Sequence, residues 1–401
     1  MEASGKADLV LMKGGIPPWL FDRMKKLALP VVEAILMQYG KAEFLARLSD
    51  PFWFQSFSSV IGMDWNTSGA TTAVTNALKQ ALNPVSKELG LFICGGKGKA
   101  SLQTPTELLN VGYRTGLDGN ELAKFSKLTA KVDSTAVQDG FQVYLHSFIA
   151  SDEGDWSVIQ QGMHIQNRKA RRYHWHSGSV DSFTDEPHAA ICGLNDGQII
   201  NLVDHDAQPA QRGILDISKE SPEKILKEIP HLVMSGRMNV RAKDIDLKRL
   251  GSVLWLAQEN ETKNFEDLLL LKGLGPRTLQ SLTLVSEVIH GTPSRFSDPA
   301  RFVFANGAKR GHPFPVLTKV YDETISTLTT AVEKAKLQQS DKLQAIQKLS
   351  ELAYQAEKHF EVTDTLETII QKENEESDQY GGRSVNVYSS KEDNSQLSLF
   401  D

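Results

Sequence analysis

The stretches FQVYLHSF, residues 141–148, and WSVIQ, residues 156–160, decide the predicted fold class of this chain. Apolar and polar residues alternate along both stretches, which places them on opposite faces of an extended backbone. Two such stretches so close together predict paired strands. A short apolar run, LFIC at residues 91–94, predicts a further buried strand.

Helices are predicted on both sides of this central region. Apolar residues recur at three- and four-residue steps from Pro17 to Leu48, and a second helix is predicted from Thr71 to Leu82. The chain becomes helical again after about Ser221, and one or two long amphipathic helices are predicted from Val316 to Gln371. The sequence therefore predicts a mixed α/β (α+β) body with long C-terminal helices.

The composition bounds the class of protein. The 401 residues predict two or three domains, and the 40% hydrophobic content excludes a wholly disordered chain. The net charge of −6 argues against a general nucleic-acid coat but not against a local basic site. Cys94 and Cys192 stand in no metal-binding spacing, so neither a disulfide framework nor a Cys-based zinc site is expected. No apolar run approaches the ~18 residues that cross a bilayer, and Met1–Lys13 lacks a signal-peptide profile, so we expect a cytoplasmic protein without membrane contacts.

The chain is predicted to contain regions of different character. They are a mixed α/β region with the expected catalytic and nucleic-acid-binding residues (1–220), a helical region (221–295), a loop with long amphipathic helices (296–371), and a disordered acidic tail (372–401).

Residues 265–279, FEDLLLLKGLGPRTL, carry the most specific motif inside the chain. A short helix is predicted to end at Gly273, and Pro276 suits the first turn of a second helix, whose early N–H groups lack partners within the helix. Gly273 and Gly275 allow the backbone to approach a ligand closely, and Leu274 between them can pack between the helices. Exposed N–H groups and the helix dipole form an anion site that fits one phosphate.

The segment from Asn264 to His290 resembles the helix-hairpin-helix family of DNA-binding motifs, which grip phosphates and carry little sequence information. Arg277 and Lys272 add positive charge beside the predicted phosphate. The predicted DNA contacts of this motif are Gly273, Leu274, Gly275 and Arg277. The alternative is a glycine-terminated helix joined to a second helix without a ligand.

Carboxylates, a lysine and a histidine gather in the central region. Oxygen ligands hold Mg²⁺ or Mn²⁺, the metal activates water and a lysine stabilises developing charge, so this set predicts a site for phosphodiester cleavage. Asp133 and Asp139 are the expected metal ligands, since residues six apart lie on one side if both belong to an extended segment. Asp64 is the expected third metal ligand, Lys131 would stabilise charge, and His146 would act as ligand or base. The alternative is that these residues are turn aspartates and solvated charges.

Two basic stretches predict phosphate contacts. RRYHWH, residues 171–176, mixes cations with aromatic faces, a composition that can bind phosphate and stack bases. GGKGK, residues 95–99, follows the predicted strand and could hold an anion through backbone N–H groups. It is not a Walker A loop, because Ala100 follows it. The expected phosphate-binding residues are Gly95, Gly96, Lys97, Lys99, Arg171, Arg172 and His174.

Simpler interpretations of both basic stretches stay open. The first could be a strand with a basic outer face and with Tyr173 and Trp175 in the core, or a metal pair at His174 and His176 on one strand face. The second could be a plain flexible turn.

Several strings together resemble a family of bacterial and archaeal proteins catalogued as a domain of unknown function. The strings are PWLFDRM (18–24), DWNTSGATT (64–72), GGKGK (95–99), KVD (131–133), QDG (138–140), QGM (161–163), ARRYHW (170–175) and GHPFPV (311–316). The resemblance spans roughly residues 8–365 and implies no particular reaction. Asn66 stands where the family pattern has His, and Ala308 and Arg310 stand where it has Gly and Asp. If those positions bind a metal in the family, the metal site is altered in this chain.

QLSLF, residues 396–400, resembles the pentapeptide by which bacterial replication and repair proteins dock on the sliding clamp. Leu397, Leu399 and Phe400 are apolar residues in an acidic tail, where only a partner would bury them. Gln396 offers amide hydrogen bonds at the rim of a groove, and the preceding segment would act as a tether near DNA. The alternative is a chance match.

The sequence therefore predicts a DNA-processing protein with DNA and the sliding clamp as partners. The favoured activity is that of a metal-dependent nuclease in replication-linked DNA repair. Two alternatives stay open: a non-catalytic DNA-binding adaptor recruited to the clamp, and a nucleotide-using enzyme such as a nucleotidyltransferase.

Overall fold

The computed structural model describes residues 9–10, 16, 18–63, 68–164, 169–193, 195–228, 247–260 and 262–300. The chain divides into two units, Met1–Asn306 and Gly307–Asp401, and all described residues lie in the first. They form the predicted mixed α/β fold, and its strands are arranged in two antiparallel sheets. The helices predicted after residue 315 and the predicted tail lie outside the described residues. None of the helices within the described ranges combines the length and the low polarity that a membrane crossing requires.

The larger sheet contains the strands that the alternating pattern predicted. Its strands are β1 (Leu9–Val10), β2 (Leu91–Lys97), β4 (Gln142–Ser151), β5 (Trp156–His164), β6 (Lys169–His176) and β7 (Ala190–Cys192). They follow the order β1-β6-β5-β4-β2, with β7 also paired to β6. The antiparallel pairing of β4 with β5 sets His146 opposite Gln160, so the predicted strand pair is confirmed. The smaller sheet has the order β3-β8-β9, with β3 at Val137–Gln138, β8 at Gln198–Asn201 and β9 at Phe296–Ser297.

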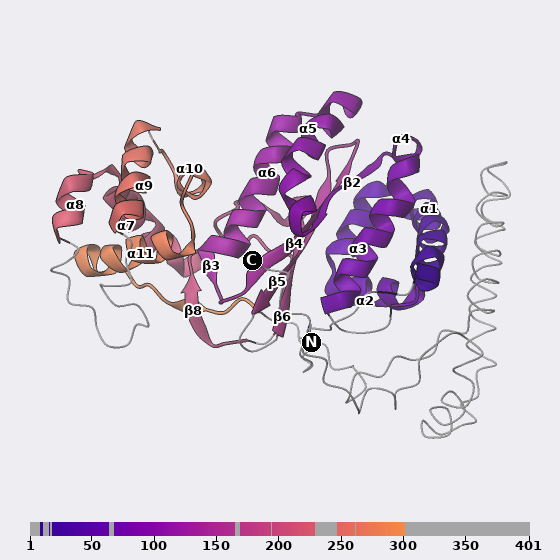
Figure 1. The fold of residues 1–401 in the computed structure, drawn as a ribbon, viewed down its shortest axis with the longest axis horizontal. Helices are drawn as coiled ribbons and strands as arrows, with labels where there is room; N and C mark the ends of the chain where they lie inside the picture. The colour runs from indigo at the N-terminus through magenta and orange to yellow at the C-terminus, as the bar shows by residue number, and fades with distance from the viewer. Residues whose placement is uncertain are drawn as a thin grey trace, which may run out of the picture. The chain divides into compact units, whose positions relative to one another are not determined.

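Helices cover both faces of the larger sheet (Figure 1). The helices α1 (Pro18–Ser49), α2 (Pro51–Val60) and α3 (Ser68–Leu82) lie on one side, and α5 (Thr104–Thr115) and α6 (Gly119–Lys131) lie on the other, while the short α4 (Ser86–Leu89) leads into β2. The start of α2 is encoded locally, because Asp50 accepts a hydrogen bond from the Trp53 N–H and Pro51 takes the first helical position. Asp118 caps α6 in the same way.

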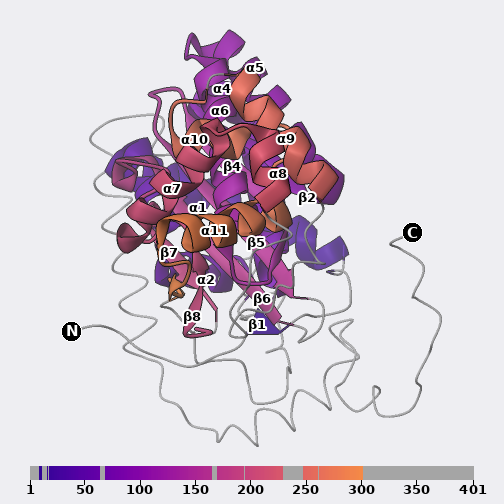
Figure 2. The ribbon, with the colours of Figure 1, turned by 90° about the vertical axis from the view of Figure 1, so that its left-hand side faces the viewer.

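A second group of helices packs beside the smaller sheet (Figure 2). They are α7 (Gln208–Lys219), α8 (Pro222–Glu228), α9 (Leu247–Glu259), α10 (Phe265–Leu270) and α11 (Pro276–His290). Leu254, Leu268 and Leu279 of these helices belong to the same buried cluster as Phe148 and Trp175 of the larger sheet. One continuous core therefore joins the larger sheet to the helices that flank the GLG motif.

Gly95 lies within β2, so the loop predicted at this residue is wrong: the strand continues through it and pairs with β4. Its φ is +86°, and a Cβ on it would lie 2.3 Å from the carbonyl oxygen of His146 and 2.4 Å from Oγ1 of Thr104. The Gly95 N–H donates to Glu107, and the Gly95 carbonyl oxygen accepts from Lys79. Glycine is therefore needed here for close packing, and its N–H is already engaged by the protein.

We expect Gly95→Ala to lower the free energy of unfolding by about 3 kcal/mol, because the new Cβ would collide with a backbone oxygen as well as strain φ. Gly98→Ala is the matched control. Its φ of +59° is also positive but nothing lies within 4 Å of the added Cβ, so the loss should be about 1 kcal/mol. Urea unfolding of both variants measures the difference, and equal losses would contradict the packing role of Gly95.

Candidate functional site

Asp133 and Asp139 do not lie in one extended segment, the condition under which they were expected to share one side. The N–H of Val132 still bonds to the carbonyl oxygens of Leu128 and Thr129, so the backbone stays helical and Val132–Ala136 winds as a π-helix. Such turns are rare and occur frequently at functional sites. Asp133 lies in this π-helix, and Asp139 lies in the turn between β3 and β4. The two aspartates therefore do not share one face of an extended segment.

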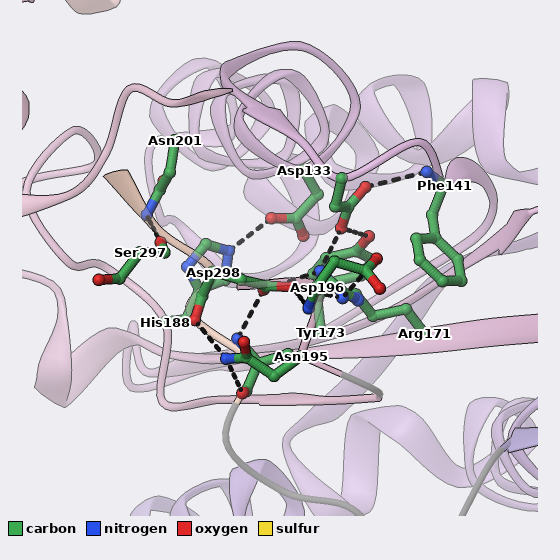
Figure 3. Close-up of polar contacts among 12 residues, drawn as sticks. Asp133, Phe141, Arg171, Tyr173, His188, Asn195, Asp196, Asn201, Ser297 and Asp298 are labelled. Atoms are coloured by element: carbon green, nitrogen blue, oxygen red, sulfur yellow. Dashed lines mark hydrogen bonds and ion pairs between the residues drawn. The ribbon is translucent and has the colours of Figure 1, made fainter. Parts of the chain in front are cut away.

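The Asp133 carboxylate is fully buried and accepts hydrogen bonds at both oxygens. Figure 3 shows its contact with His188. Its Oδ1 lies 2.5 Å from Nε2 of His188. Its Oδ2 accepts from Nε1 of Trp175 at 2.9 Å and from Nε2 of Gln160 at 2.5 Å. Burial raises the pKa of Asp133, against the opposing effects of His188 and Trp175.

Gln160 connects Asp133 to a second predicted catalytic residue, His146. The side-chain oxygen of Gln160 lies 2.8 Å from Nδ1 of His146, and Oγ of Ser126 lies 2.8 Å from Nε2 of His146. Burial lowers the pKa of His146 to about 4. Both ring nitrogens of this neutral histidine are thus occupied by protein groups, which leaves neither one for a metal or a substrate.

Asp139 lies in a buried ion network centred on Arg171. Its Oδ2 accepts from Nη1 of Arg171 at 3.0 Å and from the Tyr173 hydroxyl at 2.6 Å, and its Oδ1 accepts from the Phe141 N–H at 2.9 Å. The same guanidinium bonds to Asp298 at 3.0 Å and 2.8 Å. Burial raises the pKa of Asp139, although the positive charge of Arg171 lowers it. Burial lowers the pKa of Arg171, but Asp139, Tyr173 and Asp298 raise it by more, so the net shift is upward.

The two carboxylates do not fit a Mg²⁺ or Mn²⁺ site. Asp133 and Asp139 are fully enclosed, and each accepts three hydrogen bonds from protein donors. Within the described ranges, no group of three or more His, Cys, Asp or Glu side chains is arranged to hold a metal ion. Asp64 lies outside the described residues, so the metal-binding role predicted for this residue stays a prediction.

Lys131 and Gln138 join this polar centre to the two-helix hairpin, by which we mean α10, the turn 271–275 and α11. Nζ of Lys131 donates to the carbonyl oxygen of Leu274 at 2.5 Å, and Nε2 of Gln138 donates to the carbonyl oxygen of Pro276 at 3.0 Å. The predicted catalytic lysine therefore holds the tip of the hairpin.

Two of the features expected at the turn of the hairpin, a buried Leu274 and a positive φ at Gly273, are present, whereas the backbone of Gly275 does not require glycine. Leu274 is 1% exposed, so it packs between the helices as expected. Gly273 has a φ of +90°, a conformation that favours glycine. Gly275 precedes α11 with φ −128° and ψ 178°, which any residue adopts. Lys272 and Arg277 are exposed on either side of the turn.

The residues predicted to hold phosphates divide into a buried and an exposed set. Arg171, Arg172 and His174 are fully buried in β6, where Nε of Arg172 lies 2.8 Å from Nε2 of His174. They therefore contribute nothing to the surface that a nucleic acid could contact. Lys97 is exposed at the last position of β2, and Lys99 is exposed two residues beyond it. Gly96 lies inside β2 and has a φ of +139°.

Sequence patterns missed His188 and Asp298, the partners of the two buried aspartates. His188 precedes β7 and is 55 residues from Asp133 in the chain, so no local spacing connects them. The available signal was the gathering of six of the ten histidines between His146 and His205.

The fold and this centre define an α+β protein in which a buried polar cluster supports a glycine-containing two-helix hairpin. The family described as "Protein of unknown function (DUF763)" matches residues 5–316, and the chain belongs to this family, which confirms the predicted resemblance. No curated protein and no solved structure matches the chain.

We expect acid to destabilise the protein through His146. Its folded pKa of about 4 is lower than its ordinary value of 6.5, so its contribution is complete above pH 6.5 and is lost as the pH falls towards 4. The loss is roughly 3 kcal/mol, since one pKa unit corresponds to about 1.4 kcal/mol. His146→Gln should therefore flatten the dependence of the unfolding free energy on pH in this window.

The control for this experiment is His205→Gln. Asp185 raises the pKa of the exposed His205, which places its pH dependence above pH 6.5. The unfolding free energy of this variant, measured by urea unfolding at several pH values between 4 and 6.5, should depend on pH with the same slope as that of the parent. The assignment fails if His146→Gln also keeps the slope of the parent.

Proposed function

We propose that this protein binds the phosphate backbone of DNA at the turn between α10 and α11, and that it acts in DNA processing. The observation that carries the proposal is the N-terminus of α11. No side chain caps it and its first turn holds no acidic residue. The early N–H groups and the helix dipole are thus available to an anion.

Positive charge surrounds this helix start. Lys272 and Arg277 are exposed beside it, and the ammonium group of Lys131 contacts the carbonyl oxygen of Leu274 inside the turn. A phosphate placed at Gly275 would meet backbone donors and nearby cations together. Such contacts are made to the backbone rather than to base edges, so binding should depend little on DNA sequence.

The turn is also held rigidly, which favours a binding role. Leu274 is anchored in the core, and Lys131 and Gln138 hold the carbonyl oxygens of Leu274 and Pro276. A ligand therefore meets N–H groups that are already oriented, and little conformational entropy is lost on binding. This arrangement agrees with the helix-hairpin-helix resemblance of the sequence.

DNA binding by the hairpin is compatible with both a processing enzyme and an adaptor. Metal-dependent nuclease activity at Asp133 and Asp139 stays a prediction, as does the use of a nucleoside triphosphate. The enclosure of these two carboxylates favours the adaptor over a nuclease whose metal they would hold.

We expect Gly275→Val to weaken DNA binding more than about tenfold on unrelated duplexes alike, because its side chain would occupy the space beside the first N–H groups of α11. The backbone of Gly275 is extended, so the variant should fold normally. Fluorescence anisotropy measures Kd, and thermal unfolding checks the fold. A correctly folded variant that binds DNA like the parent would show that the hairpin is structural only.

Charge variants separate the hairpin from the rest of the surface. Lys272→Gln with Arg277→Gln should weaken binding and reduce the slope of log K against log salt by roughly two. The control, Lys26→Gln with Lys87→Gln, removes the same charge from exposed residues of α1 and α4 and should bind like the parent. Equal losses of DNA affinity in the two double variants would indicate general electrostatic attraction instead of a specific binding site.

We also propose that residues 396–400, which lie outside the described residues, dock the chain on a bacterial sliding clamp and so link it to replication and repair. Leu399→Ala with Phe400→Ala should weaken binding of purified clamp more than about tenfold, because such anchors carry most of the energy of short-peptide recognition. Calorimetry measures the affinity, and DNA binding should not change. Equal clamp affinity for parent and variant would contradict this docking.

A further inference from the structure

The histidine bonded to Asp133, His188, is arranged unlike His146, the other histidine of the hydrogen-bond network around Asp133. The side chain of His188 is 6% exposed, and its Nε2 lies 2.5 Å from Oδ1 of the fully buried Asp133. Its ring packs against Trp175 and Tyr173, with ring centroids 4.3 Å and 6.2 Å away. A carboxylate and two aromatic rings therefore fix both the position and the orientation of this imidazole.

The carboxylate also determines which ring nitrogen carries the proton. An ionised Asp133 can only accept a hydrogen bond at Oδ1, so a neutral His188 beside it donates from Nε2 and carries its lone pair on Nδ1. Figure 3 shows one ring nitrogen facing Asp133 and the other turned away from it. Among the described residues, no side chain or backbone group forms a hydrogen bond with Nδ1 of His188.

His146 provides an internal comparison. Its two ring nitrogens are both bonded to protein groups, Gln160 and Ser126, which is the arrangement of a purely structural histidine. His188 instead has one ring nitrogen fixed by a buried carboxylate, and its other ring nitrogen has no hydrogen-bond partner among the described residues. That is the arrangement by which an imidazole accepts or donates a proton in catalysis.

Both members of the pair come from segments that are bonded to the hairpin. Asp133 follows Lys131 by two residues, and Lys131 holds the carbonyl oxygen of Leu274. The loop that leads to His188 is attached to α10, because the N–H of Phe183 donates to Glu266 at 3.4 Å. Hydrogen bonds therefore connect the hairpin to the segments that carry both members of the pair.

We propose that His188 is a general acid–base residue acting on a phosphodiester of the nucleic acid held at the hairpin, with Asp133 as its positioning residue. The inference rests on the proposed DNA binding. In the reaction, Nδ1 of His188 takes a proton from water while the water oxygen bonds to phosphorus. The bond between phosphorus and the leaving oxygen breaks, and that oxygen takes the proton back from Nδ1, so atoms and charge balance.

The first test compares cleavage with binding in the full chain. End-labelled single-stranded, flapped and duplex DNA are incubated with the parent, with or without Mg²⁺ or Mn²⁺. We expect cleavage by the parent and a loss of about a hundredfold or more in kcat for His188→Gln, with Kd for DNA unchanged. Asp133→Asn should lower kcat in the same direction without raising KM. The control is His205→Gln, an exposed histidine paired with Asp185, which should cleave like the parent.

The outcomes of this test are distinct. A parent that binds these DNAs but cleaves none of them contradicts the acid–base role and leaves the proposed binding function intact. A parent that binds no DNA contradicts the proposed function and the substrate assigned to the pair. Unchanged cleavage by His188→Gln would also overturn the role of His188.

A second measurement requires no variant to fold. Nitrogen NMR of the parent labelled with ¹⁵N-histidine reports which ring nitrogen of His188 is protonated at neutral pH. We expect the proton on Nε2 and an unprotonated Nδ1, and a proton on Nδ1 of the neutral ring would contradict the proposal.

Discussion

A fully buried guanidinium, that of Arg171 in β6, is the interaction on which the arrangement of the site depends. It pairs with Asp139 in the turn before β4 and with Asp298 after β9. Removing these charges from water is costly, and the two carboxylates offset that cost only because the geometry is close. Loss of one partner would leave an uncompensated buried charge, a change that typically costs about 3–5 kcal/mol. The network thereby fixes both sheets against each other.

That constraint explains how the polar centre and the hairpin are held in fixed positions relative to each other. With β3 fixed against the larger sheet, the π-helix before it sets Asp133 against Trp175 of β6. The same segment presents Lys131 and Gln138 to the turn of the hairpin. The buried aspartates thus bond to protein groups, and the groups that we propose for a ligand are the start of α11 and Nδ1 of His188. This division of roles differs from the metal site that the sequence predicted.

Local patterns predicted the strand pair 141–148 with 156–160 and the two helices around Leu274. Both the alternation of apolar and polar residues and the Gly-x-Gly-Pro pattern lie within a few consecutive residues, so they can be read from the sequence. They did not predict that Arg171 and Arg172 are buried, since neighbouring cations usually indicate a solvated surface and the partner Asp298 is 127 residues away. The π-helix also escaped prediction, because nothing in KVD distinguishes a helix end from a strand start. His188 was missed for the same reason as Asp298: its partner is distant in the chain.

The central claim is that a nucleic acid contacts the backbone at the start of α11. Hydrogen–deuterium exchange of the full chain, with and without a short DNA duplex, tests it most directly because it reports on the backbone N–H groups themselves. The account predicts that DNA slows exchange in the turn 271–275 and the first turn of α11, and leaves the amides of α4 and α5 unaffected. Protection confined to other segments, with no change at the start of α11 while DNA is bound, would contradict it.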